Sequence, residues 1–296
     1  MQQHISLTFL GGDARSRAMA TRLAWLGARV TAYGLFEGEI PSNIRVASTV
    51  QGALGDCHAI ILPMPAFDRE GKLFCPLRSP DDPTVTPEWL FAHIHRDVPV
   101  YGGRLSETTL SLARERGITL FDYAAMEEVQ IRNAVPTVEG ALCLAMRTLD
   151  VTLWGARVAV LGYGRIGALL AQRLQALGAH TTVAARKMRD VARIEVAGCR
   201  ALHIRDEASL SPLSAGFDVI FNTVPHRILA PPLMAAMPKK TLMIELASSP
   251  GGWDPDAPMS CQALYAPGLP AKHTPQPAGN ILADCLWPLL KEVTPL

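Results

Sequence analysis

A glycine-rich turn near the middle of the chain carries the clearest chemical signal. Gly162, Gly164 and Gly167 form a Gly-x-Gly-x-x-Gly pattern between an apolar, valine-containing run over 158–161 and an amphipathic run over 168–177. In such a turn the first glycine permits the bend, the second lets a pyrophosphate approach bare backbone, and the third lets the helix pack on the strand. The helix N-terminus then offers unpaired N–H groups to the phosphates. The pattern predicts a dinucleotide-binding site rather than a merely structural turn, made of Gly162, Tyr163, Gly164, Arg165, Ile166 and Gly167.

The end of the next strand, expected over 179–185, indicates which dinucleotide binds. An NAD site places Asp or Glu there to bind the ribose 2′-hydroxyl. This chain has Arg186 and Lys187 instead, followed by Arg189. Cationic side chains suit a 2′-phosphate, which a carboxylate would repel, so the sequence favours NADP (NADPH) over NAD. The alternative is that these residues form the solvated basic start of a helix.

Two later strands, expected over 217–221 and 241–244, end in loops that we expect beside the nicotinamide. Ligands of open α/β sheets bind at the carboxyl ends of the strands. The residues assigned to cofactor binding in these loops are Asn222, Thr223, Val224, Pro225, Glu245 and Ala247. Glu245 either orients the nicotinamide ribose or only ends its strand.

Three residues are candidates for a catalytic role, and His226 is the best of them for proton transfer. His226 follows the first nicotinamide-side loop, and its reference pKa of about 6.5 suits general acid–base work; the alternative is an ordinary loop histidine. Asn133 either hydrogen-bonds substrate or caps a helix. Glu139 is either a buried acid or a first-turn carboxylate favoured by the helix dipole.

These residues must be positioned by a repeated arrangement of strands and helices. A strand, a glycine turn and a helix also open the chain over 5–33, and further strands are expected over 58–62, 98–101 and 119–121. Such alternation predicts an α/β fold with two doubly wound parallel-sheet (Rossmann-like) domains and an active-site cleft between them. The first glycine turn does not complete the dinucleotide pattern, because Arg15 and Arg17 stand near positions that need small residues, so a second cofactor is not expected.

The expected domain boundaries follow from the bridge between the two repeats. An apolar helix over 137–149, with Pro136 in its first turn, opens an NADP-binding domain over 137–280. An N-terminal substrate or partner domain is expected to consist of two segments, 1–136 and 281–296. In the second segment apolar residues recur at helical spacing.

Composition excludes several classes of function. With 296 residues the chain is long enough for two cores, and its formal net charge of +1 without a basic run argues against nucleic acid as a partner. No apolar run reaches the roughly 18 to 20 residues of a membrane helix, and the chain opens on a strand, so a cytoplasmic protein is expected. Six scattered cysteines and eight histidines show no metal-ligand spacing, so no metal site is expected.

Five motifs occur in the same order as in a known family, the A subunits of dipicolinate synthase. They extend over nearly the whole chain: Gly11-Gly-Asp-x-Arg15, Asn133-Ala-x-Pro-Thr-x-Glu-Gly140, the Gly162 turn, Glu245-Leu-Ala-Ser-x-Pro-Gly-Gly252 and Pro267-Gly-Leu-Pro270. The chain resembles this family, with two departures: Glu245 stands where Asp is expected, and Lys272-His273 stand where a smaller, more apolar sequence is expected.

The resemblance implies a pyridine-nucleotide oxidoreductase that makes dipicolinate, the calcium chelator of bacterial endospores. The reaction would be the NADP-linked dehydrogenation (aromatisation) of dihydrodipicolinate or its hydroxylated precursor, a small cyclic dicarboxylate, in the cytoplasm of the mother cell of a sporulating bacterium. The resemblance also implies that the partner is the flavoprotein-like B subunit of dipicolinate synthase, with FMN on that partner only. Self-association as a homo-oligomer stays open.

For such a dianion the cationic candidates are Arg104, Arg132 and Lys272, because Arg binds a carboxylate bidentately and Lys supplies a point charge. Gly102 and Gly103, after the strand expected over 98–101, complete the substrate set. The alternatives are a surface charge at Arg104, an exposed helix-end charge at Arg132 and, for Lys272, a place in the proline-rich loop expected over 267–277.

Two other functions stay open from the sequence. A two-domain NAD(P)-dependent 2-hydroxy- or 2-amino-acid dehydrogenase would share the fold and the glycine turn. A non-catalytic NADP-binding component of a flavoprotein complex would bind NADPH without turnover.

Overall fold

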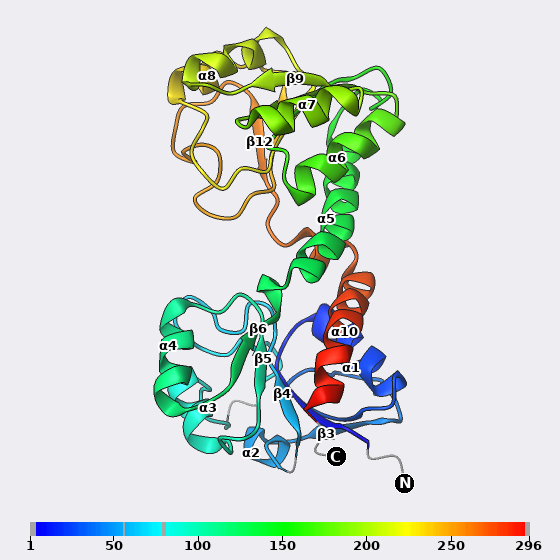
Figure 1. The fold of residues 1–296 in the computed structure, drawn as a ribbon, viewed down its shortest axis with the longest axis vertical. Helices are drawn as coiled ribbons and strands as arrows, with labels where there is room; N and C mark the ends of the chain where they lie inside the picture. Colours follow the sequence, from blue (N-terminus) through cyan, green and yellow to red (C-terminus); the bar gives the residue numbers. More distant parts are fainter. Residues whose placement is uncertain (1–3, 56, 79–80, 294–296) are drawn as a thin grey trace. The chain divides into compact units, whose positions relative to one another are not determined.

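A computed structural model describes residues 4–55, 57–78 and 81–293 of the chain (Figure 1). The chain divides into two compact units. Unit 1 consists of Met1–Asn133 and Thr274–Leu296, and unit 2 consists of Ala134–His273. The boundaries expected from the sequence, after residues 136 and 280, lie slightly further along the chain. The second one differs because the C-terminal helix already begins at Pro275.

Unit 1 is built on a parallel sheet with the strand order β3-β2-β1-β4-β5-β6 among its described residues. This is the order of doubly wound nucleotide-binding sheets, in which right-handed crossovers place helices on both faces. Its strands are β1 (Ser6–Leu10), β2 (Arg29–Tyr33), β3 (Ile44–Ala47), β4 (Ala59–Ile61), β5 (Val100–Gly102) and β6 (Leu120–Asp122). Its helices include α1 (Ala14–Trp25), α2 (Val50–Ala53), α3 (Pro87–His93), α4 (Glu107–Arg116) and α10 (Pro275–Glu292).

Helix α10 covers unit 1 beside α1, although the two come from opposite ends of the chain (Figure 1). Leu282 and Leu286 of α10 share one buried core with Met19 and Leu23 of α1. The helices approach closely because Gly279 has no side chain: a Cβ there would lie 2.2 Å from the carbonyl oxygen of Arg15. Burial of these apolar side chains stabilises the return of the chain to unit 1.

Unit 2 repeats the same sheet, with the order β12-β11-β10-β7-β8-β9 and parallel pairing throughout its described strands. The strands are β7 (Arg157–Leu161), β8 (His180–Ala185), β9 (Arg200–His203), β10 (Val219–Asn222), β11 (Leu242–Glu245) and β12 (Gln262–Tyr265). Its helices include α6 (Arg165–Ala176), α7 (Met188–Val196), the 3₁₀ helix η2 (Glu207–Ala215), α8 (Pro231–Ala235) and α9 (Leu269–His273). The prediction of two doubly wound parallel α/β sheets is confirmed.

The helix α5 contains the boundary between the units and differs from the sequence-based expectation. It runs over Glu127–Thr148, so Pro136 lies inside the helix rather than in its first turn. A helix of 22 residues tolerates this proline because only one backbone N–H donor is lost. The cap role considered for Asn133 and the first-turn role considered for Glu139 are therefore wrong, and Glu139 is exposed rather than buried.

The segment expected to be a proline-rich loop is largely helical. It contains α9 and the first turn of α10, where Pro275 occupies a starting position that proline favours. Lys272 consequently lies on α9 and is exposed. Of the helices described, none combines the length and the apolar character needed to cross a membrane.

Candidate functional site

The glycine turn of unit 2 joins β7 to α6 and has the geometry of a phosphate-binding turn. Gly162 has a φ of 98°, and a Cβ on it would lie 2.6 Å from Oγ1 of Thr223. A Cβ on Gly167 would lie 2.2 Å from the carbonyl oxygen of Gly162. Gly164, by contrast, is exposed, and a Cβ there would meet nothing within 4 Å. Two glycines therefore serve packing, and the third leaves open space in front of the backbone.

Gly164 is also the N-cap of α6, and no side chain caps this helix. The first-turn N–H groups, which have no intrahelical acceptor, thus keep their capacity to bind an anion. On the other side of the turn, Oγ1 of Thr223 donates to the carbonyl of Leu161 at 2.8 Å, which fixes the loop after β10 against the turn. The residues present fit a pyrophosphate at this position.

The loops after β10 and β11 are joined by a buried hydrogen-bond network around Glu245. Its carboxylate accepts from Nδ2 of Asn222 at 2.8 and 3.0 Å, from the N–H of Ala247 at 2.9 Å and from the N–H of Gly252 at 2.7 Å. Asn222 uses its remaining capacity on Val224, accepting from the N–H at 3.1 Å and donating to the carbonyl at 3.0 Å. Both side chains are committed to protein partners.

Burial raises the pKa of the Glu245 carboxyl, and the donors on Gly252, Ala247 and Asn222 oppose that rise. Because every oxygen of this side chain already accepts hydrogen bonds, Glu245 and Asn222 position the loops rather than reach a ligand themselves. This geometry favours a supporting role over the direct cofactor contact expected from the sequence. The backbone of Thr223, Val224, Pro225 and Ala247 is what the network holds in place.

Replacing Glu245 with glutamine tests this network. The Glu245→Gln substitution places an NH₂ group against N–H donors and leaves a buried donor without an acceptor. We therefore expect the free energy of unfolding to fall by about 2 kcal/mol. Thermal and denaturant unfolding of the purified chain would measure it. Glu195→Gln, at an exposed position on α7 in the same unit, is the matched control and should change stability little. Equal stability of the two variants would contradict the role of the network.

His226 lies in the exposed loop after β10. The loop is anchored just beyond this residue: the N–H groups of Ile228 and Leu229 both donate to the carbonyl of Gly252 at 2.9 Å, and Arg227 pairs with Asp254 at 3.0 Å. The imidazole is therefore carried by a fixed backbone and stays accessible to solvent.

The carboxyl end of β8 carries the basic residues predicted to select the cofactor. Arg186 and Lys187 are exposed at the turn into α7, and Lys187 is the helix N-cap. Arg189 takes part in a different interaction, since its Nε lies 3.6 Å from Oδ1 of Asp190. No carboxylate occupies the position after β8 where an NAD site has one.

In unit 1 the predicted substrate residues Gly102, Gly103 and Arg104 follow β5. Arg104 has a φ of 57° and is the non-glycine residue with positive φ in the described part of the chain. The carboxylate of Asp122 holds this turn by accepting from the N–H groups of Arg104 at 3.0 Å and Leu105 at 3.1 Å. A left-handed non-glycine backbone is sterically costly and accumulates at functional sites. The sequence alone did not indicate Asp122, which directly follows the strand expected over 119–121.

Glycine is required at position 103 by the neighbouring loop. A Cβ there would lie 2.7 Å from both Cβ of Met64 and Cε2 of Tyr123. Tyr123 itself donates to the carbonyl of Leu62 at 2.9 Å, and burial raises the pKa of its hydroxyl. The loops after β4, β5 and β6 thus form one rigid edge that presents Arg104 to solvent.

A second charged group lies at the same edge, where the loop after β1 leads into the first turn of α1. Arg15 forms an ion pair with Asp13 at 2.8 Å and also donates to the carbonyl of Met64. The glycine turn beside it is covered by the chain itself: the N–H of Gly12 donates to the carbonyl of Phe74 at 2.9 Å, and a Cβ on Gly11 would lie 2.6 Å from that oxygen. This turn therefore packs against protein, unlike the turn at Gly164.

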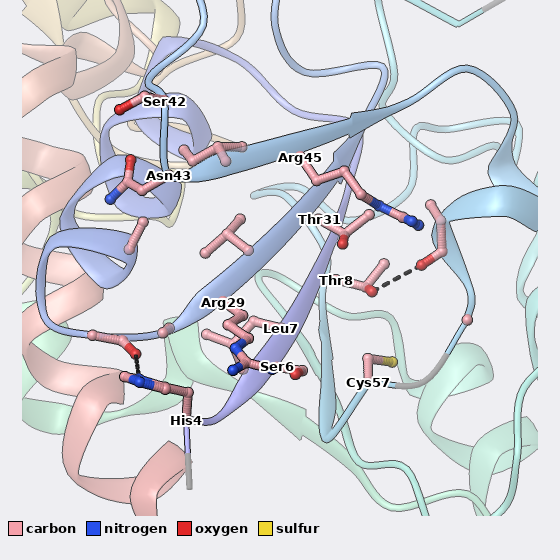
Figure 2. A pocket seen from close by; sticks show the side chains of 17 residues that line it. His4, Ser6, Leu7, Thr8, Arg29, Thr31, Ser42, Asn43, Arg45 and Cys57 are labelled. Carbon is pink, nitrogen blue, oxygen red and sulfur yellow. Dashed lines mark hydrogen bonds between the residues drawn. The ribbon is translucent and has the colours of Figure 1, made fainter. Parts of the chain in front are cut away.

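The opposite edge of the unit 1 sheet holds a hollow of about 890 Å³ (Figure 2). Ser6, Arg29 and Asn43 line it at the amino ends of the strands. In its wall the hydroxyl of Thr8 donates a hydrogen bond to the carbonyl of Ala53 at 2.9 Å. None of the site candidates lines this hollow. Because ligands of open α/β sheets bind at the carboxyl ends, we do not assign the site to it.

The structure groups the candidates by unit. The cofactor candidates lie along one edge of unit 2, after β7, β8, β10 and β11, with His226 beside them. Gly102, Gly103 and Arg104 lie together in unit 1, whereas Arg132 and Asn133 belong to the first half of α5. Glu139 and Lys272 lie on the helices α5 and α9 of unit 2, away from the strand ends in sequence, and both are exposed.

Two family models match the chain, one in each unit. Residues 6–124 match the N-terminal domain of the dipicolinate synthase A subunit, and residues 136–250 match the NAD binding domain of D-isomer specific 2-hydroxyacid dehydrogenases. The A subunit of dipicolinate synthase from Bacillus subtilis (strain 168) is 32% identical over 297 residues, which cover 98% of this chain and 97% of that protein. The chain belongs to the family of dipicolinate synthase A subunits.

Solved structures agree with this assignment. The crystal structure of the dipicolinate synthase A chain from Bacillus subtilis has a TM-score of 0.86 at 30% identity, covering 99% of this chain and 98% of that one. The A subunit from Bacillus halodurans gives 0.86 at 31% identity, covering 98% and 99%. An L-alanine dehydrogenase, at 13% identity and a TM-score of 0.65 over 96% and 89% of the two chains, shares the fold alone. The predicted family is confirmed. The match to a dehydrogenase NAD binding domain makes the protein an oxidoreductase with a nicotinamide cofactor.

Proposed function

We propose that this member of the dipicolinate synthase family catalyses the NADP-linked dehydrogenation of dihydrodipicolinate, or of its hydroxylated precursor, to dipicolinate. The observation that carries the proposal is the combination of an open glycine turn and a basic β8 end in unit 2 with the strained, exposed Arg104 in unit 1. Family membership over nearly the full length supports the substrate class.

The cofactor assignment rests on chemistry at two strand ends. The N–H groups at the start of α6 and the open space at Gly164 suit the pyrophosphate, and Arg186 and Lys187 suit a 2′-phosphate. Bound NADP would supply the acceptor for a hydride. The network of Glu245 and Asn222 keeps the loops after β10 and β11 rigid, so these loops lose little conformational entropy when the cofactor binds.

The substrate is a cyclic dicarboxylate, and the chain contributes cations and a proton acceptor. Arg104 can bind one carboxylate bidentately, because Asp122 holds only the backbone of its turn. Arg132, Lys272 and the amide of Asn133 are further candidates for the second carboxylate. Glu139 is the weakest catalytic candidate because it lies inside α5 rather than in a loop at a strand end. Oxidation of the dihydropyridine ring removes one hydride and one proton, and we assign the proton to His226, because imidazole side chains exchange protons near neutral pH.

The proposal is tested by assaying the purified chain with freshly prepared dihydrodipicolinate and either NADP or NAD. Dipicolinate and reduced nicotinamide would be measured separately, with and without a candidate flavoprotein B subunit, which we propose as partner because the relatives are named as A subunits or A chains. We expect equal amounts of the two products, with NADP preferred. FMN, where present, would belong to the B subunit.

The alternatives give different results in the same assay. NADPH binding without turnover, with activity restored by the B subunit, would make the chain a non-catalytic nucleotide-binding component. The match of residues 136–250 to 2-hydroxyacid dehydrogenases favours a second candidate, oxidation of a 2-hydroxy or 2-amino acid. Turnover of such acids, together with no dipicolinate under any condition, would replace the proposal by that activity.

A further inference from the structure

The ends of β8 and β9 bring a further arginine, in the turn after β9, beside the basic turn after β8. The strands are parallel neighbours with Ala185 opposite His203, and the N–H of Ile204 donates to the carbonyl of Ala185 at 2.9 Å. The turn after β9 therefore lies next to the turn that carries Arg186. The turn after β9 exposes Arg205 and Asp206, and the sequence alone gave Arg205 no role.

Arg205 is connected to the Arg186 turn through the ring of His203. Nε of Arg205 lies 3.2 Å from Nδ1 of His203, and Nε2 of the same ring lies 3.1 Å from the carbonyl oxygen of Arg186. Because the guanidinium only donates, Nδ1 must accept and Nε2 must carry the proton that it donates to the carbonyl. The neutral imidazole of His203 thus holds the guanidinium of Arg205 and the backbone of Arg186 in a fixed arrangement.

The acidic residues nearby form no ion pair with Arg186, Lys187 or Arg205 in the described part of the chain. Asp190 lies 3.6 Å from Arg189 and 3.7 Å from Arg193, both on α7. The carboxylate of Asp206 accepts from the N–H of Ser209 at 2.9 Å and from its hydroxyl at 2.7 Å, as the cap of η2. The hydrogen bonds from Ser209 lower the pKa of the Asp206 carboxyl, and the nearby charge of Arg205 lowers it further. The side chains of Arg186, Lys187 and Arg205 are nevertheless exposed, so a ligand can reach all three.

We propose that His203 and Arg205 are specificity-determining residues for the cofactor, with Arg205 adding a guanidinium to a 2′-phosphate subsite and His203 positioning it against the Arg186 turn. The ligand group is a phosphomonoester dianion on the ribose, which a guanidinium binds through charge-assisted hydrogen bonds. The dinucleotide without that phosphate gains nothing from Arg205. This inference rests on the proposed function insofar as unit 2 binds NADP.

The test measures dissociation constants of NADPH and NADH for the full purified chain by nicotinamide fluorescence. Arg205→Ala should weaken NADPH about tenfold, as expected for a lost charge-assisted hydrogen bond, and leave NADH unchanged. His203→Phe keeps a ring of similar size, removes both hydrogen bonds and should also lower the preference for NADPH. Arg200→Ala, which removes an exposed arginine at the start of the same strand β9, is the matched control and should leave both affinities unchanged.

The readout separates this inference from the cofactor proposal. A wild-type preference for NADPH that persists in both Arg205→Ala and His203→Phe would overturn the subsite and leave the NADP assignment standing. Equal weakening of both nucleotides would also overturn it, because a purely structural role does not change the preference. A wild-type chain without preference for NADPH would overturn the cofactor assignment and the subsite together.

Discussion

Gly164→Val is expected to weaken dinucleotide binding by roughly 100-fold, about 3 kcal/mol, while unit 2 stays folded. The backbone at position 164 is extended, with φ −87° and ψ −162°, and a Cβ there meets no protein atom within 4 Å. Valine tolerates an extended backbone, so folding is not disturbed. Its methyl groups, however, would occupy the space through which a pyrophosphate approaches the N–H groups of α6, and two charge-assisted hydrogen bonds would be lost.

The neighbouring glycine provides the contrast that makes this prediction specific. Gly167→Ala places a Cβ 2.2 Å from the carbonyl oxygen of Gly162, so it should lower thermal stability before it affects binding. Circular dichroism melting and NADPH titration of both variants would distinguish the two effects. If Gly164→Val bound NADPH as tightly as the unchanged chain, the pyrophosphate would have to bind elsewhere.

The sheets of both units follow from local sequence. Short apolar runs such as 158–161, each followed by glycine and a helical pattern, leave few topologies other than parallel strands with right-handed crossovers. The two errors at helices concern proline. Pro136 lies inside α5, because the flanking turns supply enough hydrogen bonds and burial to offset one missing donor. Pro275 begins α10 instead of belonging to a loop, since proline suits a first helical turn.

The candidate site shows which contacts a single sequence hides. Spacing alone identified Gly162, Gly164 and Gly167, because the pattern lies within a single turn. The close approach of Thr223 to Gly162 appears only in the fold. The bond from Asn222 to Glu245 and the bond from Arg104 to Asp122 join strand ends that only the folded sheet brings together. The sequence could indicate Glu245 as a residue near the cofactor. Only the structure gives the number of hydrogen bonds that its carboxylate accepts, and this number favours positioning of the loops over direct binding of the cofactor.

Arg104→Gly is expected to stabilise unit 1 and at the same time impair the enzyme. The backbone of Arg104 has a φ of 57°, where a non-glycine residue costs about 1 kcal/mol or more, and glycine removes that cost. The substitution also removes the guanidinium that we assign to a substrate carboxylate, so kcat/KM for dihydrodipicolinate should fall by roughly 100-fold. Denaturant unfolding and steady-state kinetics on one preparation would measure both changes.

Arg104→Ala separates the two effects, because it removes the charge but retains a side chain at the strained position. It should lose as much activity as Arg104→Gly without the gain in stability. The backbone strain at Arg104 would then accompany the placement of a cation on a rigid turn. Asp122 holds this turn by a hydrogen bond, and Gly103 packs it against Tyr123. Normal kinetics in both variants would remove Arg104 from the substrate site, and unchanged stability in Arg104→Gly would show that Asp122 alone accounts for the left-handed backbone.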